Sequence, residues 1–217
     1  MEKTVAHLWP ALLNGLTTTM TISLAALILG VPLALLLAAA GRGARWIRGL
    51  AGIYLSFWRG TPILVQLLII FYVLPLLGLE LDPIVAAIVA LALNTAAFQS
   101  EIYRAGLQAI PKGEIEAAKM LGLSARTIFL HIEAPQAFRT MLPAIVGEMQ
   151  ALVKNSSLVS VIAVTDLTRR AQQVAASTFR PLDAYASALI LYVAIGVILA
   201  GVGLLIERRL SHRSEGQ

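Results

Sequence analysis

Long apolar segments alternate with short polar ones along the whole chain. About 20 helical residues cross the hydrocarbon of a bilayer, and each apolar segment reaches this length. The segments cover approximately residues 12–40, 54–79, 84–105, 141–164 and 184–206. The pattern therefore predicts an all-α integral membrane protein with five transmembrane helices, which form one transmembrane domain over residues 1–217.

The composition agrees with lipid as the main solvent. The chain is 58% hydrophobic and 13% charged, with a mean hydropathy of +0.80, whereas a soluble domain carries about 25% charged residues. The net charge of +5 comes from basic clusters beside the apolar segments, such as Arg42, Arg45 and Arg48. This placement is typical of cytoplasmic loops and argues against nucleic acid as a partner. The start of the chain lacks the basic segment of a signal peptide, so we expect the first span to be retained.

No residue pattern indicates a metal or disulfide. The chain has no cysteine, and its three histidines are far apart. We therefore expect no metal site and no cofactor in this chain.

The segment 110–140 is polar and interrupts the apolar pattern. Pro111 suits the first turn of a helix, and Gly122 suits a left-handed residue after its end. Ser124 is a good N-cap for a second helical run, which we expect to end at Pro135. The segment is predicted to form two short helices joined by a tight turn.

Within this segment, Glu116, Ala117 and Ala118 are followed by Gly122. The string E-A-A-x3-G resembles the coupling loop of ABC importer membrane subunits. The resemblance implies that the loop lies in the cytoplasm, docks on an ATPase subunit and passes its motion to the pore. The alternative is a plain helical hairpin on a membrane protein.

Two further strings resemble one branch of that family. Trp58-Arg59-Gly60-Thr61-Pro62, with Gln66 beyond it, is similar to the F-R-G-T-P-x-x-x-Q signature of polar amino acid permeases. Residues 154–158, K-N-S-S-L, resemble the K-[DN]-[ST]-S-L string of the same proteins. The resemblance implies the type I ABC importer permease fold, with a motif or gate at Arg59, Gly60, Thr61 and Pro62. From chemistry alone, these four residues could also be a proline-kinked helix end with a snorkelling arginine.

Polar residues inside the third and fourth spans are candidate contacts for a solute, since such residues usually face a bundle interior or a water-filled path. Glu148 is the main candidate, because its spacing of six from Lys154 is poor for a pair within one helix. A free carboxylate there would favour an ammonium or guanidinium group. The other candidates on the substrate path are Asn94, Gln99, Asn155 and Ser156. Asn94 could equally bond neighbouring helices, and Glu101 with Arg104 is expected to form an ion pair.

Residues 165–183 are amphipathic and are predicted to form a surface helix, capped by Thr165. This helix could face a solute-binding protein, or it could lie on the membrane as a gate.

The strings of an ATP-binding loop and of a zinc protease are absent from the sequence, so we expect a transporter subunit and not an enzyme. The resemblance implies an ATP-driven importer of polar, and by Glu148 basic, amino acids that works by alternating access in the bacterial inner membrane. Its partners would be two ATPase subunits, which hold ATP and Mg, a second permease subunit (self or homologue), and an extracytoplasmic solute-binding protein. The distribution of basic residues places the N-terminus outside and the C-terminus in the cytoplasm. The alternatives are an ABC permease for an opine, sulfur amino acid or osmolyte, and an ATPase-independent channel or carrier.

Overall fold

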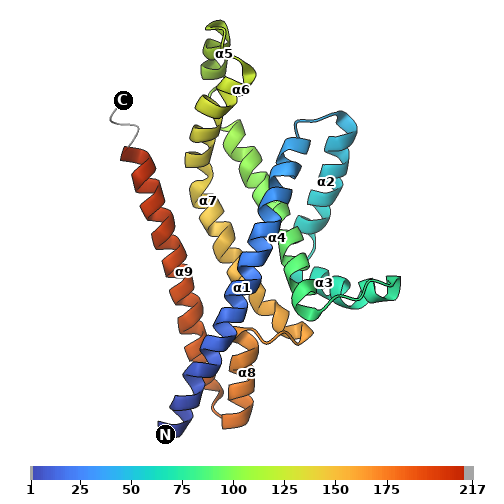
Figure 1. Cartoon of the computed structure of the whole chain (residues 1–217), viewed down its shortest axis with the longest axis vertical. Coiled ribbons are helices and arrows are strands. Elements are labelled where there is room, and N and C mark those ends of the chain that lie inside the picture. Colours follow the sequence, from blue (N-terminus) through green and yellow to red (C-terminus); the bar gives the residue numbers. More distant parts are fainter. Residues whose placement is uncertain (1, 213–217) are drawn as a thin grey trace.

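The computed structural model describes residues 2–212, and helices account for nearly all of this part (Figure 1). The α-helices are α1 (Glu2–Ala40), α2 (Arg45–Gly60), α3 (Ile63–Leu68), α4 (Pro83–Gln108), α5 (Lys112–Met120), α6 (Ala125–Ile128), α7 (Ala134–Asn155), α8 (Leu167–Thr178) and α9 (Pro181–His212). The π-helical turns are η1 (Ile69–Val73) and η3 (Phe129–Glu133), and the 3₁₀ segments are η2 (Leu74–Leu77) and η4 (Ser156–Ile162). No strand occurs between residues 2 and 212.

Three single helices are long and apolar enough to cross a membrane, namely α1, α4 and α9. Two further spans arise if each of two bent helix pairs counts as one: α2 with the helix after it, and α7 with α8. In the first of these pairs the helix begins at Arg45, before the predicted start of the apolar segment near residue 54. Its early turns are amphipathic, with arginines among apolar residues, so a search for a continuous apolar run misses them.

The long helices run between two ends of an elongated bundle (Figure 1). The short helices α5 and α6 lie at one end, together with the end of α9. The N-terminus and α8 lie at the opposite end. Figure 1 also shows α1 crossing the face of α4, and these two helices form the most extensive contact in the bundle.

Small residues allow this close packing. Three alanines of α4, Ala86, Ala87 and Ala90, are fully buried. A Cβ placed at Gly30 of α1 would lie 3.0 Å from Thr95 Cγ2 of α4. In membranes, where water does not drive helices together, contacts of this kind supply much of the association energy through van der Waals packing.

The N-terminal half of α1 packs just as closely on α8. A Cβ at Gly15 would lie 2.7 Å from Arg170 Cγ and 2.8 Å from the Asp166 carbonyl oxygen. Thr19 Oγ1 accepts a hydrogen bond of 3.1 Å from the Leu167 N–H. The end of the bundle opposite α5 is therefore held by α1, α8 and α9 together, whose buried apolar residues form one cluster.

The helix ends differ from two sequence predictions. The second helical run does not end at Pro135, because η3 continues directly into α7. The Ala134 N–H donates to the Phe129 carbonyl, so the wide turn accommodates a proline that lacks an N–H. The N-cap of α8 is Asp166 and not Thr165, since the Asp166 carboxylate accepts from the N–H groups of Thr168 and Arg169.

Candidate functional site

The string W-R-G-T-P lies at a sharp break in the second span. Residues 45–60 and 63–77 are bent by 106° at this break. Thr61 and Pro62 have extended backbones, and Pro62 has no N–H to continue the helix. The last carbonyls of α2 therefore lose their helical donors. Trp58 is buried, and unsatisfied polar groups are costly in buried positions.

Two buried amide side chains supply these donors. Gln66 Nε2 lies 2.9 Å from the Trp58 carbonyl oxygen, 3.0 Å from the Thr61 carbonyl oxygen and 2.7 Å from Thr61 Oγ1. Asn94 Nδ2, on α4, donates to the Trp58 carbonyl at 3.2 Å and to Gln66 Oε1 at 2.9 Å. We call Gln66, Asn94 and Thr61 the amide clasp. These contacts favour the interpretation that Asn94 bonds neighbouring helices over the interpretation that it contacts a solute.

Arg59 follows the buried Trp58 in the chain, and its side chain contacts Phe98 and Glu101 of α4. Its Nη1 atom lies 3.1 Å from Glu101 Oε2, and its guanidinium lies 5.7 Å from the centre of the Phe98 ring. Arg104 binds the same carboxylate through two hydrogen bonds of 2.9 and 2.7 Å, so the expected pair of Glu101 and Arg104 is present. Glu101 thus joins α2 to α4, while Gly60 and Pro62 remain exposed.

The remaining candidates on the substrate path differ in their surroundings. Gln99 is fully buried: its Oε1 accepts from the Tyr103 hydroxyl, whereas its Nε2 has no hydrogen-bond partner among the described residues. Ser156, the first residue of η4, is also fully buried and donates to the Val153 carbonyl near the end of α7. Asn155 is half-buried.

Glu148 contacts α4 from the middle of α7. The Thr95 hydroxyl donates to Glu148 Oε1 at 2.8 Å. Thr95 is itself buried against Gly30 of α1, so the bond lies where three helices approach one another. Within residues 8–210, no cationic side chain forms an ion pair with Glu148, and Lys154 is exposed. The carboxylate could therefore accept a cationic group from a solute.

The E-A-A string lies on α5, at the tip of the molecule (Figure 1). Ala118 is buried, while Glu116 and Ala117 are exposed. Gly122 follows with φ of +75°, the left-handed conformation that glycine adopts most easily. Gln136 Nε2 donates to Glu114 Oε2 at 2.6 Å, which ties α5 to the start of α7. Met120 and Leu121 are 89% and 80% exposed, so the turn presents apolar side chains to the surroundings.

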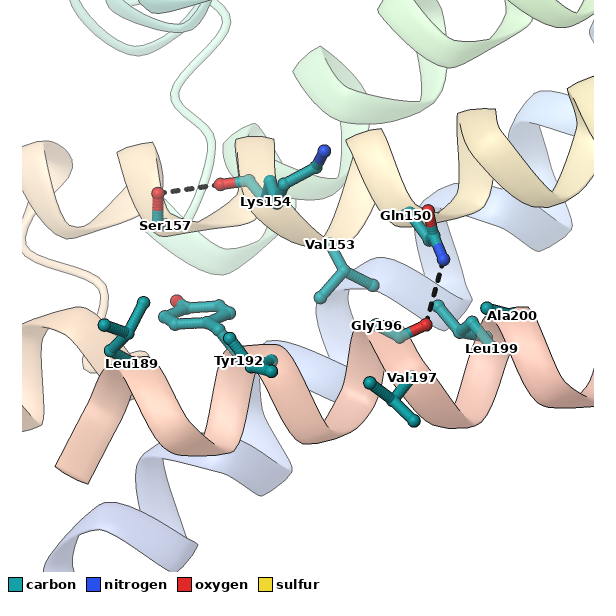
Figure 2. A pocket seen from close by; sticks show the side chains of 11 residues that line it. Gln150, Val153, Lys154, Ser157, Leu189, Tyr192, Gly196, Val197, Leu199 and Ala200 are labelled. Atoms are coloured by element: carbon teal, nitrogen blue, oxygen red, sulfur yellow. Dashed lines mark hydrogen bonds between the residues drawn. The ribbon is translucent and has the colours of Figure 1, made fainter. Parts of the chain in front are cut away.

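A groove of about 560 Å³ between α7 and α9 holds none of the predicted site residues (Figure 2). Gln150 Nε2 donates to the Gly196 carbonyl at 2.9 Å across it, as Figure 2 shows. Tyr192 and Lys154 line its other part. The sequence signal for this contact is a glutamine in one apolar span and a glycine in another, which is too weak to identify the pair.

The chain belongs to the family of binding-protein-dependent transport system inner membrane components, whose family model matches residues 30–212. It is accordingly a membrane-spanning permease subunit of an amino acid ABC transporter, and it is a transporter subunit and not an enzyme. No group of three or more metal-binding side chains occurs among the residues that the structure describes.

Curated relatives and solved structures agree with this class. The chain is 42% identical to the arginine transport system permease protein ArtQ of Bacillus subtilis, with 93% of each chain covered. It is 34% identical to the glutamine transport system permease protein GlnP of Escherichia coli, over 94% of this chain and 95% of that protein. Its structure matches that of an amino acid ABC transporter crystallised with histidines, with a TM-score of 0.87 and 34% identity over 92% of this chain and 94% of that one. The type I importer permease fold is thereby confirmed, with three to five candidate membrane spans among the described residues.

Proposed function

We propose that the protein imports basic amino acids, and that ATP-driven alternating access moves them past Glu148. The observation that carries the proposal is a carboxylate inside a spanning helix to which no cationic side chain of residues 8–210 is paired. An ionised group in this position is costly unless it is paired, so a cationic solute would gain from binding beside it. The arginine permease among the relatives, at 42% identity, supports the same solute class.

Other relatives are named as permeases for different solutes. The L-cystine permease TcyB of Bacillus subtilis is 38% identical, and the octopine permease OccM of Rhizobium meliloti is also 38% identical. Cystine has no net charge at neutral pH, and glutamine, the solute named for GlnP, is neutral as well. The substrate proposal therefore depends on Glu148 and not on family membership.

The test is uptake by the complete transporter in proteoliposomes, with arginine, lysine and histidine compared with glutamine and cystine. Glu148→Gln should lower basic amino acid uptake at least tenfold and leave any neutral uptake nearly unchanged. Glu148→Asp keeps the charge and should restore part of the basic uptake. If Glu148→Gln transports arginine as the parent protein does, the carboxylate does not bind the solute.

The coupling part of the proposal assigns α5 and its turn to the ATPase subunit. Exposed apolar residues at a polar tip, next to a left-handed glycine, suit docking into a groove on another chain. Gly122→Arg and Glu116→Lys should each separate ATP hydrolysis from uptake. Gly78 is a matched control, because it also has positive φ and open space around it but lies far from the tip. Gly78→Arg should keep coupling intact; equal losses in both arginine variants would mean that backbone strain, and not docking, is responsible.

The proposed orientation places α5 and the C-terminus in the cytoplasm and the N-terminus outside. It follows from the basic residues at the α5 end of the bundle, such as Arg42, Arg45, Arg48 and Arg208. A solute-binding protein would then deliver the amino acid at the α8 end, and a second permease subunit would complete the pore. A cysteine introduced at residue 3 should react with a membrane-impermeant maleimide in whole cells, and one at residue 215 should not; the reverse pattern contradicts the orientation.

A further inference from the structure

A small pocket with charged walls lies between α1, α2 and α4, at the end of the bundle where α5 is found. Its volume is about 230 Å³. Apolar walls come from α1 and α2, and a polar wall comes from α4 and the first turn of α2. The lining residues used below are Leu37, Arg48, Gly52, Leu55, Glu101 and Arg104. Neither Glu148 nor Thr95 lines this pocket, so it is separate from the proposed solute site.

The charge around the pocket is positive. Arg48 and Arg104 line it, and Arg59 is paired with the lining carboxylate of Glu101. Three arginines against one glutamate leave two positive charges (3 − 1 = 2). Arg48 is exposed and forms no ion pair within residues 8–210. The pocket therefore favours an anion. It disfavours an ammonium group, because the carboxylate already holds two guanidinium groups.

The pocket combines its arginines with apolar walls. Leu37 of α1 and Leu55 of α2 both line it. On the opposite face of α2, Trp46, Leu50 and Ile53 are 69%, 60% and 70% exposed. An indole near arginines at the end of a span is typical of the boundary between headgroups and hydrocarbon. A ligand that fits here has an anionic head for the arginines and an apolar part that lies against Leu37 and Leu55.

We propose that the pocket between α1, α2 and α4 binds the headgroup of an anionic phospholipid, with Arg48 as the main phosphate contact and the adjoining part of the acyl chains against Leu37 and Leu55. Basic pockets between transmembrane helices bind anionic headgroups by this chemistry. The proposal needs only that this end of the bundle lies at a headgroup layer. It is independent of which amino acid is carried.

The first test measures retained lipid by native mass spectrometry of the complete transporter, taken from nanodiscs of mixed phosphatidylglycerol and phosphatidylcholine. We expect retained phosphatidylglycerol in preference to phosphatidylcholine. Arg48→Gln should lower this preference about fivefold, the equivalent of about 1 kcal/mol for one basic residue. Arg45→Gln is the matched control, since Arg45 is also exposed on the first turn of α2 but does not line the pocket. Equal losses in both variants would indicate diffuse attraction to the surface and overturn the site.

The second test fills the pocket without removing a charge. Gly52 lines the pocket and Gly49 does not, and a Cβ at either position meets no atom within 4 Å. Gly52→Leu should displace the retained lipid, and Gly49→Leu should keep it. Unchanged retention in Gly52→Leu overturns the proposal, as does displacement of the lipid by excess inorganic phosphate, which would identify a free-anion site. Because the readout is bound lipid, failure of the transport proposal would not affect this result.

Discussion

Replacing Gln66 with leucine should destabilise the break in the second span more than any other single amide substitution in the described spans. Gln66 is 1% exposed, so water cannot take over its hydrogen bonds. Leucine removes the donor that the Thr61 carbonyl receives and the acceptor that Asn94 Nδ2 uses. The Trp58 carbonyl keeps only the longer bond from Asn94, at 3.2 Å.

The size of the effect follows from the bonds lost. Gln66 makes four polar contacts in the clasp, which the two protons of Nε2 and the acceptor Oε1 can satisfy as about three full hydrogen bonds. Such bonds contribute about 0.6 kcal/mol each on average inside membrane proteins. The lower estimate of the loss in unfolding free energy is therefore about 2 kcal/mol. Two stranded polar groups, at about 1–3 kcal/mol each, raise the upper estimate to about 4 kcal/mol after partial relaxation. For a chain of this size, the Tm should fall by about 4 to 16 °C.

The assay is thermal unfolding in detergent, followed by loss of the monodisperse peak, together with hydrogen exchange of residues 57–66. Gln150→Leu is the matched control, because Gln150 is a half-buried membrane glutamine with one interhelical bond. The Gln150→Leu variant should lose about 0.6 kcal/mol of unfolding free energy. Hydrogen exchange should rise at the break in Gln66→Leu and stay unchanged there in Gln150→Leu.

The double variant with Asn94→Leu provides the decisive comparison. Because each single variant strands the other amide, the double variant should be less destabilised than the sum of the two, by about 1 kcal/mol. Strict additivity, or a Gln66→Leu protein as stable as Gln150→Leu, would refute the view that the two amides hold the break together.

Three further changes test other contacts by the same unfolding assay. Gly15→Val should lower the free energy of unfolding by about 1–3 kcal/mol, because the larger side chain forces α1 away from α8. Gly201→Val is the control and should cost far less, since a Cβ there has open space. Equal Tm values for the two variants would contradict the close contact. Asp166→Ala should cost about 1–2 kcal/mol, more than Asp82→Ala, which removes one capping bond instead of two. Gly122→Ala should cost about 1 kcal/mol because of its positive φ, and an unchanged Tm would show that the turn adopts another conformation.

Much of this protein could be predicted from features that are local in sequence. The charge-free first segment has to be a membrane helix, since no other structure satisfies its backbone in lipid. Pro111, Gly122 and Ser124 act within one helical turn, and they begin both short helices and end the first one where expected. The Glu101–Arg104 pair is also local, three residues apart on one helix. Motif resemblance identified the family, because its strings are short and contiguous.

The partners of the polar residues inside the spans could not be predicted in this way. Gln66 and Asn94 are 28 residues apart, and Thr95 and Glu148 are 53 apart. The pairing of buried amides and carboxylates depends on the crossing angle of the helices and on the rotation of each helix about its axis. The apolar pattern of the sequence constrains neither of these quantities closely. Asn94 illustrates the limit: its sequence position suits a solute contact and an interhelical bond equally, and the packing of α4 against the broken second span gives it protein partners. The sequence determined which segments cross the membrane, because burial in lipid is decided residue by residue along one helix. Only the tertiary structure decided which polar groups are already paired, because pairing depends on contacts between helices far apart in the chain.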